Sequence, residues 1–365
     1  MVDAKHLLQI KIEPDYEALK ANLLRKGTPA RVHYMELFED YEIKLAVNKL
    51  FGVWDSIDEN DPYCHWKREI EMQRFLGYDC VAGGVAWSGF PRDTIPVEDA
   101  NIVKDQKRQA RNWTDEHRGP IGNWEDFEKY PWPDPKSIRT DGLEWLAKNL
   151  PDGMGIYAGC HSVFEQVTWL FGYETLCMSL YDQPDLVDAM FERIGSLLYE
   201  VAKVLVQMDK VDIIFGGDDM GFKTATMISA QALIEKSFPW HKKMAAIAHE
   251  HGKIYILHSC GNLDEVMEAL IEDVKIDGRH SFEDEIEPVT QAKRKYGDRI
   301  ALLGGIDVNF LCLANEPEIR QRVRDTLDVC MPGGGYCLGS GNSVTNYIPV
   351  ENYLIMLDEG RKYGF

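Results

Sequence analysis

The chain contains eight short runs of apolar and β-branched residues, and most of them are separated by segments with a helical pattern. The runs cover residues 31–37, 78–83, 155–160, 211–216, 253–258, 274–280, 300–305 and 336–339. Strands that alternate with helices indicate parallel βαβ units, and eight such units close most simply as a (β/α)8 TIM barrel. A doubly wound open sheet is the alternative, but no G-x-G-x-x-G motif follows the first run. We therefore predict an α/β fold of the TIM-barrel type.

The spacing of the runs also predicts how the chain is divided. Barrels of this kind often exceed 250 residues as one unit, so we expect a single domain over residues 1–365. Residues 1–29 form an N-terminal helical extension, and residues 84–154 form a long helical and loop insertion after the second strand. The insertion contains five tryptophans, which argue against disorder. It either packs on the barrel rim or acts as a lid.

Charge and composition exclude several classes of partner. The chain has 40 Lys and Arg against 60 Asp and Glu, a net charge of −20, and no basic cluster that would bind phosphates. We therefore expect no nucleic acid partner. No stretch has the roughly 18 apolar residues of a membrane span, and the first ten residues lack the pattern of an export signal. We expect a cytoplasmic protein whose eight scattered cysteines are free, buried or bound to metal.

The strongest chemical signal is His258-Ser-Cys260-Gly at the end of the fifth predicted strand. Because side chains alternate along a strand, His258 and Cys260 point to the same side, which at the end of a barrel strand is the mouth. Cys337 lies on the eighth predicted strand, whose end can converge on the same ion. One imidazole and two thiolates suit Zn²⁺ and leave a fourth position open, as in catalytic zinc sites. We predict that His258, Cys260 and Cys337 bind zinc.

Three further residues are candidates for catalysis. Asp218 and Asp219 follow the fourth predicted strand, where adjacent carboxylates suit proton transfer or metal contact. The alternative for either carboxylate is a helix cap. His280 ends the sixth predicted strand and either faces the pocket as an acid or base or is a structural histidine bonded to a nearby carboxylate.

Four residues are candidates for substrate binding. Asp307 ends the seventh predicted strand, and Trp87 lies just past the second, where it either stacks on an aromatic substrate or packs beneath the insertion. Tyr34 and Glu36 share one face of the first predicted strand, and alternation alone does not say whether that face is inward.

The His258-Ser-Cys-Gly motif, with the distant Cys337 in GGGYCLGSG, resembles the uroporphyrinogen decarboxylase superfamily and, more closely, its methyltransferase branch. The resemblance runs from about residue 28 onward and includes EDFEKYPWPDP (125–135), FEQVTWLFGYETL (164–176), GGDDMG (216–221) and LLGGIDV (302–308). It implies a TIM barrel with a His-x-Cys…Cys zinc site. It also implies methyl transfer between a partner protein that carries cobalamin, a corrinoid protein, and a thiol, an amine or a methoxylated aromatic compound.

True decarboxylases of the superfamily open with an arginine-rich segment that binds the carboxylates of the substrate. The comparable stretch here contains Glu36, Glu39 and Asp40, which would repel them. We therefore favour a zinc-dependent, corrinoid-linked methyltransferase acting on a small methylated substrate, with O-demethylation of a methoxylated aromatic as the leading example. A metal-independent decarboxylase of a polycarboxylate and a non-catalytic zinc-binding barrel remain as alternatives.

Overall fold

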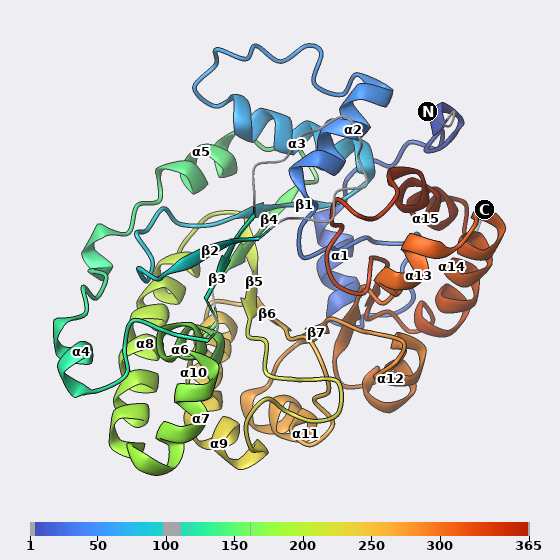
Figure 1. Cartoon of the computed structure of the whole chain (residues 1–365). Helices are drawn as coiled ribbons and strands as arrows, with labels where there is room; N and C mark the ends of the chain where they lie inside the picture. Colours follow the sequence, from blue (N-terminus) through green and yellow to red (C-terminus); the bar gives the residue numbers. More distant parts are fainter. Residues whose placement is uncertain (1–3, 98–110, 116, 161, 364–365) are drawn as a thin grey trace.

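A computed structural model of the chain describes residues 4–97, 111–115, 117–160 and 162–363. Its strands lie in the middle of the molecule, and most of the helices surround them (Figure 1). Seven strands form one parallel sheet in the order β1-β4-β5-β6-β7-β8-β9. They are β1 (Cys80–Gly83), β4 (Gly155–Gly159), β5 (Val211–Gly217), β6 (Ile254–His258), β7 (Gly278–His280), β8 (Ala301–Leu303) and β9 (Tyr336–Cys337).

The helices follow the strands in the alternation that the sequence predicts. They are α1 (Tyr16–Leu23), α2 (Tyr41–Phe51), α3 (Cys64–Leu76), α4 (Trp124–Lys129), α5 (Asp141–Asn149), α6 (Phe164–Phe171), α7 (Tyr173–Asp182), α8 (Pro184–Leu205), α9 (Ala230–Lys236), α10 (Phe238–Glu250), α11 (Met267–Ala269), α12 (Val289–Tyr296), α13 (Val308–Leu313), α14 (Glu316–Cys330) and α15 (Val350–Lys362). Two 3-10 helices, η1 (Ala4–His6) and η2 (Pro135–Ser137), and the π-helix η3 (Leu270–Val274) complete the set. In the part of the chain described, no helix combines the length and apolar character needed to cross a bilayer.

Residues 31–37, expected as the first strand, close the barrel without forming a regular strand. Tyr34 pairs in parallel with Leu338 just past β9, through backbone bonds at Met35 and His33. On the other side, Asp79 at the start of β1 accepts a bond from His33 Nδ1 at 2.7 Å. The segment therefore contacts both edges of the sheet, as the eighth position of a TIM barrel must. The prediction of a barrel is confirmed, although this strand is reduced to single bridges.

Helix α1 closes the end of the barrel at which the strands begin. Its Leu19 and Leu23 are fully buried in the interior cluster, next to residues of β5, β6 and β8. The hydroxyl of Tyr16 donates to the carbonyl oxygen of Ile156 in β4 at 2.8 Å, and Lys20 forms an ion pair with Asp212 in β5 at 2.8 Å. The interior is therefore covered at the end where the strands begin.

Alternation along the strands separates the interior of the barrel from the layer under the helices. In β6, Ile254 and Ile256 belong to the interior cluster, whereas Tyr255 and Leu257 pack against the helices. The same alternation continues into the chain that follows and turns His258 and Cys260 inward. The prediction that His258 and Cys260 point to the same side is confirmed.

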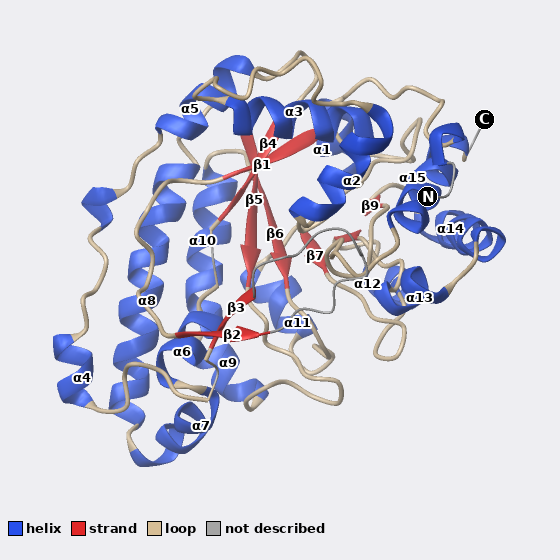
Figure 2. Ribbon diagram, turned by 45° about the horizontal axis from the view of Figure 1, so that its top comes forward, coloured by secondary structure: helices blue, strands red, loops and turns tan. Residues whose placement is uncertain are grey.

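The described part of the predicted insertion contains the antiparallel pair β2 (Thr94–Val97) and β3 (Arg111–Thr114), followed by α4, η2 and α5. Residues 98–110 and 116 of the insertion lie outside the described residues. In both ribbon views α4 lies beside α8 (Figures 1 and 2). Gln183 Nε2 donates to the carbonyl oxygen of Gly122, and Arg193 of α8 lies over the ring of Trp132. The segment around α4 therefore packs on the outside of the barrel helices.

Candidate metal site at the barrel mouth

Three metal-binding side chains meet where β5 and β6 end. Asp219 follows β5, His258 is the last residue of β6, and Cys260 comes two residues later. The distance from His258 Nε2 to Asp219 Oδ1 is 3.3 Å, and the distance to Cys260 Sγ is 3.5 Å. One ligand atom from each residue lies within 4.8 Å of the other two. We refer to Asp219, His258 and Cys260 as the donor triad.

The backbone holds the donor triad in place. Asp219 Oδ1 accepts the amide hydrogen of Cys260 at 2.9 Å, which ties the end of β5 to the loop after β6. The two loops touch at Gly221 and Gly261. Gly261 has φ +78, and a Cβ atom there would lie 2.3 Å from the carbonyl carbon of Gly221. Any larger residue at position 261 would push the loops apart and separate the donors.

His280 lies behind the donor triad and orients its histidine. The Nδ1 atoms of His258 and His280 are 2.7 Å apart, and His280 is fully buried. Burial, reinforced by the neighbouring His258, lowers the pKa of His280 well below its usual value. A neutral His280 can accept the Nδ1 proton of His258, which leaves His258 Nε2 free to bind a metal. His280 does not line the large cavity described below, so its predicted role as a pocket acid or base is replaced by a supporting one.

The chemistry of the donor triad fits zinc. Imidazole, thiolate and carboxylate are the three protein ligands that zinc accepts, and three of them leave one coordination position for a substrate. The thiol of Cys260 has a pKa raised by burial and by the charge of Asp219, so a bound metal would be needed to hold it as a thiolate. Burial alone would raise the pKa of Asp219, but the hydrogen bond and charge of His258 outweigh it and lower that pKa to about 2. Asp219 is therefore ionised and available to a cation.

Cys337 is not brought to the donor triad, which corrects the predicted ligand set. Its side chain is fully buried in the interior cluster with Leu19 and Leu23, and Asn22 Nδ2 lies 3.6 Å from its sulfur. The chain runs on along the barrel after Cys337, with parallel bridges at Leu338 and Ser340. Farther along this segment, Asn342 contacts the donor triad, with its Nδ2 3.1 Å from Cys260 Sγ.

The neighbours Asp218 and Asp219 have different roles. Asp219 belongs to the donor triad, as the sequence allowed. Asp218 points the other way, is fully buried, and accepts hydrogen bonds from the Phe164 and Glu165 amides, from Ser237 Oγ and from His241 Nε2. These four bonds tie the first turn of α6 to β5 and α10. Asp218 therefore supports the structure around the site and does not enter the cavity.

The four predicted substrate-binding residues divide into two pairs. Trp87 and Asp307 line the large cavity. Tyr34 is fully buried under α15, where its hydroxyl donates to the carbonyl oxygen of Leu357 at 3.0 Å. Glu36 is 2% exposed and accepts bonds from the amide and the hydroxyl of Ser340 at 2.7 and 2.5 Å. Neither Tyr34 nor Glu36 lines the cavity, because closure of the barrel uses both side chains.

The donor triad lies in the wall of a cavity of about 1790 Å³ at the mouth of the barrel. Aromatic side chains from strands, loops and α6 line it: Phe38, Trp87, Phe90, Tyr157, Trp169, Phe215, Phe282 and Tyr347. Glu165 and Arg92 also line it, and the sequence reasoning singled out neither. Glu165 lies in the first turn of α6, which follows β4, and Arg92 lies between β1 and β2. Location in the segment after a barrel strand was the signal that could have identified them.

Glu165 holds a proton at neutral pH. Burial and the charge of nearby Asp219 raise the pKa of Glu165 to about 8, although Ser162 Oγ donates to its carboxylate at 2.6 Å. Asp219 is ionised in the same cavity. The mouth therefore offers one neutral and one charged carboxyl group to a bound molecule.

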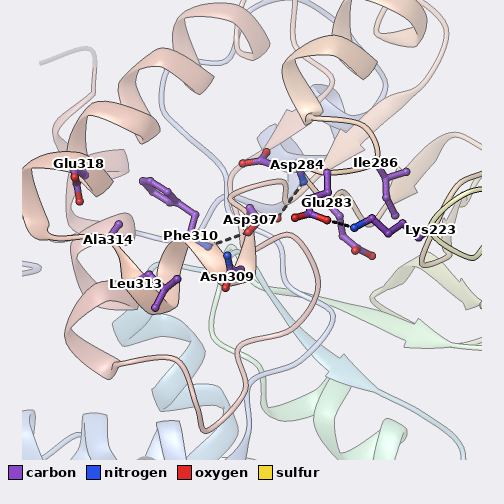
Figure 3. A pocket seen from close by; sticks show the side chains of 11 residues that line it. Lys223, Glu283, Asp284, Ile286, Asp307, Asn309, Phe310, Leu313, Ala314 and Glu318 are labelled. Carbon is purple, nitrogen blue, oxygen red and sulfur yellow. Dashed lines mark hydrogen bonds and ion pairs between the residues drawn. The ribbon is translucent and has the colours of Figure 1, made fainter.

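A smaller pocket of about 640 Å³ adjoins the cavity and shares Glu283, Asp307 and Asn309 with it. Figure 3 shows Asp307 between Phe310 and Asp284, and its two carboxylate oxygens accept the amide hydrogens of these residues at 2.9 and 3.1 Å. Asp307 thus caps α13 as well as lining the cavity. We call this smaller pocket the side pocket.

Fold and site together define a TIM-barrel protein with a candidate metal site in a wide mouth. The model of the uroporphyrinogen decarboxylase (URO-D) family matches residues 116–363, and the chain belongs to that family. Two curated relatives are uroporphyrinogen decarboxylases of Cupriavidus pinatubonensis and Cupriavidus necator, 35% and 32% identical over 79 residues. Those alignments cover 21% of this chain and 22% of each relative, so the chain matches only about a fifth of their length.

A solved structure supports the same fold over almost the whole chain. A methyltransferase from Methanosarcina mazei superposes with a TM-score of 0.70 at 16% identity, covering 96% of this chain and 99% of that one. At this identity the likeness establishes the fold. The family resemblance identified in the sequence is thus confirmed at the level of the URO-D family.

Proposed function

We propose that this protein is a zinc-dependent methyltransferase that moves a methyl group between a small methylated substrate and a corrinoid protein or a thiol. The observation that carries the proposal is the donor triad, which places three zinc-type ligands in the wall of a wide cavity. A structural zinc site would be closed by four protein ligands. In the described chain the three-ligand group includes one partly exposed carboxylate, Asp219, and faces open space.

Each residue of the site has a role in this proposal. Asp219, His258 and Cys260 would hold the zinc, and His280 would keep the ring of His258 in the binding tautomer. Zinc, when bound, supplies a Lewis acid for the heteroatom that carries or receives the methyl group. Glu165 holds a proton at the cavity wall and can give it to a leaving oxygen or nitrogen.

The width of the mouth supports a second macromolecule as the methyl partner. A cavity of about 1790 Å³ exceeds the space of about 300–1,000 Å³ that most small ligands fill. It leaves room for a cobalamin cofactor carried by a corrinoid protein to approach a substrate bound at the donor triad. The structural neighbour from Methanosarcina mazei bears the name methyltransferase, which favours the same assignment.

Decarboxylation of a polycarboxylate is the second candidate, because the family and the two Cupriavidus relatives carry the decarboxylase name. A substrate with several carboxylates requires several cations around it. Among the described residues that line the cavity, Arg92 is the single arginine and there is no lysine, while Glu165, Asp219, Glu283 and Asp307 are acidic. The charge of the cavity therefore favours methyl transfer.

The proposal is tested by offering methyl donors to zinc-loaded protein with free cob(I)alamin and following the cobalamin absorbance. Conversion of cob(I)alamin to methylcobalamin with at least one donor is expected, and Cys260→Ala should abolish it. Zinc binding without methyl transfer from any donor would support the alternative of a non-catalytic zinc-binding barrel. Failure to bind zinc, with decarboxylation of a polycarboxylate instead, would support the decarboxylase.

A further inference from the structure

Arg92 is the one arginine or lysine among the described residues that line the large cavity. Its guanidinium carbon lies 3.9 Å from the centre of the Trp169 ring, and its Nη1 donates to Gln166 Oε1 at 3.3 Å. A guanidinium has five N–H donors. Within the described part of the chain, the bond to Gln166 accounts for one of them, and no ion pair to Arg92 is formed there.

Several buried or partly buried arginines of the described chain lie against a carboxylate, whereas the buried Arg361 donates to three backbone carbonyl oxygens. Arg279 pairs with Glu287 at 3.0 Å, Arg320 with Asp358 at 2.8 Å, and Arg31 with Asp79. Glu165 lies close enough to act electrostatically on Arg92, but no ion pair joins them, and Ser162 Oγ bonds to one carboxylate oxygen of Glu165 at 2.6 Å. Among the described residues, the guanidinium of Arg92 is therefore positioned by Trp169 and Gln166 and forms no ion pair with a carboxylate.

The surroundings of Arg92 fit a flat aromatic anion. Trp87 and Phe90, which precede it in the same segment, meet edge to face with ring centres 5.6 Å apart and line the same cavity. Trp169 provides a further ring beneath the guanidinium. Aromatic walls bind a planar ring, and a fixed guanidinium binds a carboxylate through two parallel hydrogen bonds.

We propose that Arg92 binds the carboxylate of the methylated substrate, so that the substrate class is an aromatic carboxylate whose methylated group reaches the donor triad. This inference rests on the proposed function and narrows its substrate. It assigns the two chemical ends of the substrate to two parts of one cavity: the anion to Arg92, and the methylated heteroatom to Asp219, His258 and Cys260.

The test compares two probes that share a methoxy-substituted ring and differ in the carboxylate, 4-methoxybenzoate and methoxybenzene. Isothermal titration calorimetry on zinc-loaded protein should give binding of 4-methoxybenzoate at least about tenfold tighter than that of methoxybenzene. Arg92→Gln should reduce this preference to nearly one. Arg92→Lys should keep part of it, because lysine retains the charge but lacks the planar fork. Lys223→Gln, which removes a cation from the side pocket only, is the matched control and should keep the full preference.

Equal binding of the two probes, binding of neither, or an undiminished preference in Arg92→Gln would overturn the inference. If Lys223→Gln lost the preference for 4-methoxybenzoate as fully as Arg92→Gln, the inference would also be overturned. The preference would then reflect the net charge of the protein and not the position of Arg92. Cys260→Ala separates this inference from the proposed function, since loss of the metal should leave the preference intact. Preference without any methyl transfer would contradict the proposed function alone, and methyl transfer without preference would contradict the role of Arg92 alone.

Discussion

Two cysteines point into the same barrel, at opposite ends of it. Cys337 lies toward the closed end, where α1 covers the interior and Leu19, Leu23 and Asn22 surround the thiol. Cys260 lies at the open end, beside Asp219 and a cavity of about 1790 Å³. Burial raises the pKa of both thiols. The two thiols differ in the metal-binding groups near them. Cys337 lies beside Leu19, Leu23 and Asn22, whereas Cys260 lies beside a histidine and a carboxylate.

The position of a cysteine along its strand therefore decides whether it reaches the metal site as much as the face on which it lies. Alternation turns both thiols inward. Five residues separate Cys337 from Asn342, which is the residue of its segment that reaches Cys260. At about 3.3 Å for each extended residue, that separation removes Cys337 from the mouth.

The largest expected difference is in zinc binding. Cys260→Ala should lower zinc affinity by more than the 10–100-fold typical of losing a supporting residue, because it removes a ligand itself. Cys337→Ala should leave zinc content unchanged and cost about 1 kcal/mol in the free energy of unfolding, since it removes a small buried group. Metal analysis of the purified variants checks both. Equal loss of zinc from the two variants would show that both cysteines bind the metal.

A second difference is expected between the neighbouring carboxylates. Asp218→Ala leaves four buried or partly buried donors without their acceptor and should lower the free energy of unfolding by about 3 kcal/mol. Asp219→Ala should change stability by less than about 1 kcal/mol and reduce zinc binding instead. Urea denaturation and metal analysis measure the two effects. A stable Asp218→Ala variant that binds no zinc would reverse the assigned roles.

The pH dependence of the free energy of unfolding should show whether Glu165 holds a proton at the barrel mouth. The pKa of Glu165 is raised from 4.5 to about 8 in the folded protein, so its contribution is fully present below pH 4.5 and is lost as the pH rises to 8. Glu36 titrates in the same window, because burial raises its pKa to about 8. Between pH 5 and pH 8, the free energy of unfolding of metal-free Glu165→Gln should therefore fall by about 3 kcal/mol less than that of the wild type. Parallel pH profiles for the two proteins would show that Glu165 carries no such proton.

The smallest effect is expected at Asn342. Asn342→Ala removes a donor 3.1 Å from Cys260 Sγ and should lower zinc affinity by about tenfold or less. Asn342→Cys should raise the affinity by placing a second thiolate next to the donor triad. Competition with a chelator of known zinc affinity measures both changes. Tighter zinc binding in Asn342→Cys would show that position 342, unlike Cys337, reaches the metal. Weaker binding would place Asn342 outside the reach of the metal.

The sequence predicted the barrel because strand and helix periods are local signals. It also predicted His258 and Cys260, since residues two apart on a strand share a face. Tyr34 and Glu36 could not be placed, because closure of the barrel pairs their segment with residues 338–340, about 300 residues away. Arg92 was missed because the two residues that position it, Trp169 and Gln166, lie more than 70 residues away in the sequence.

We propose a metal site that contains one cysteine and lies at the open end of the barrel. Zinc K-edge X-ray absorption of the zinc-loaded wild-type protein tests it directly, because sulfur and lighter ligands bind zinc at different distances. We predict one sulfur at about 2.3 Å, with nitrogen and oxygen ligands at about 2.0–2.2 Å completing the shell. Two sulfur ligands in the wild type, reduced to one in Cys337→Ala, would contradict the account.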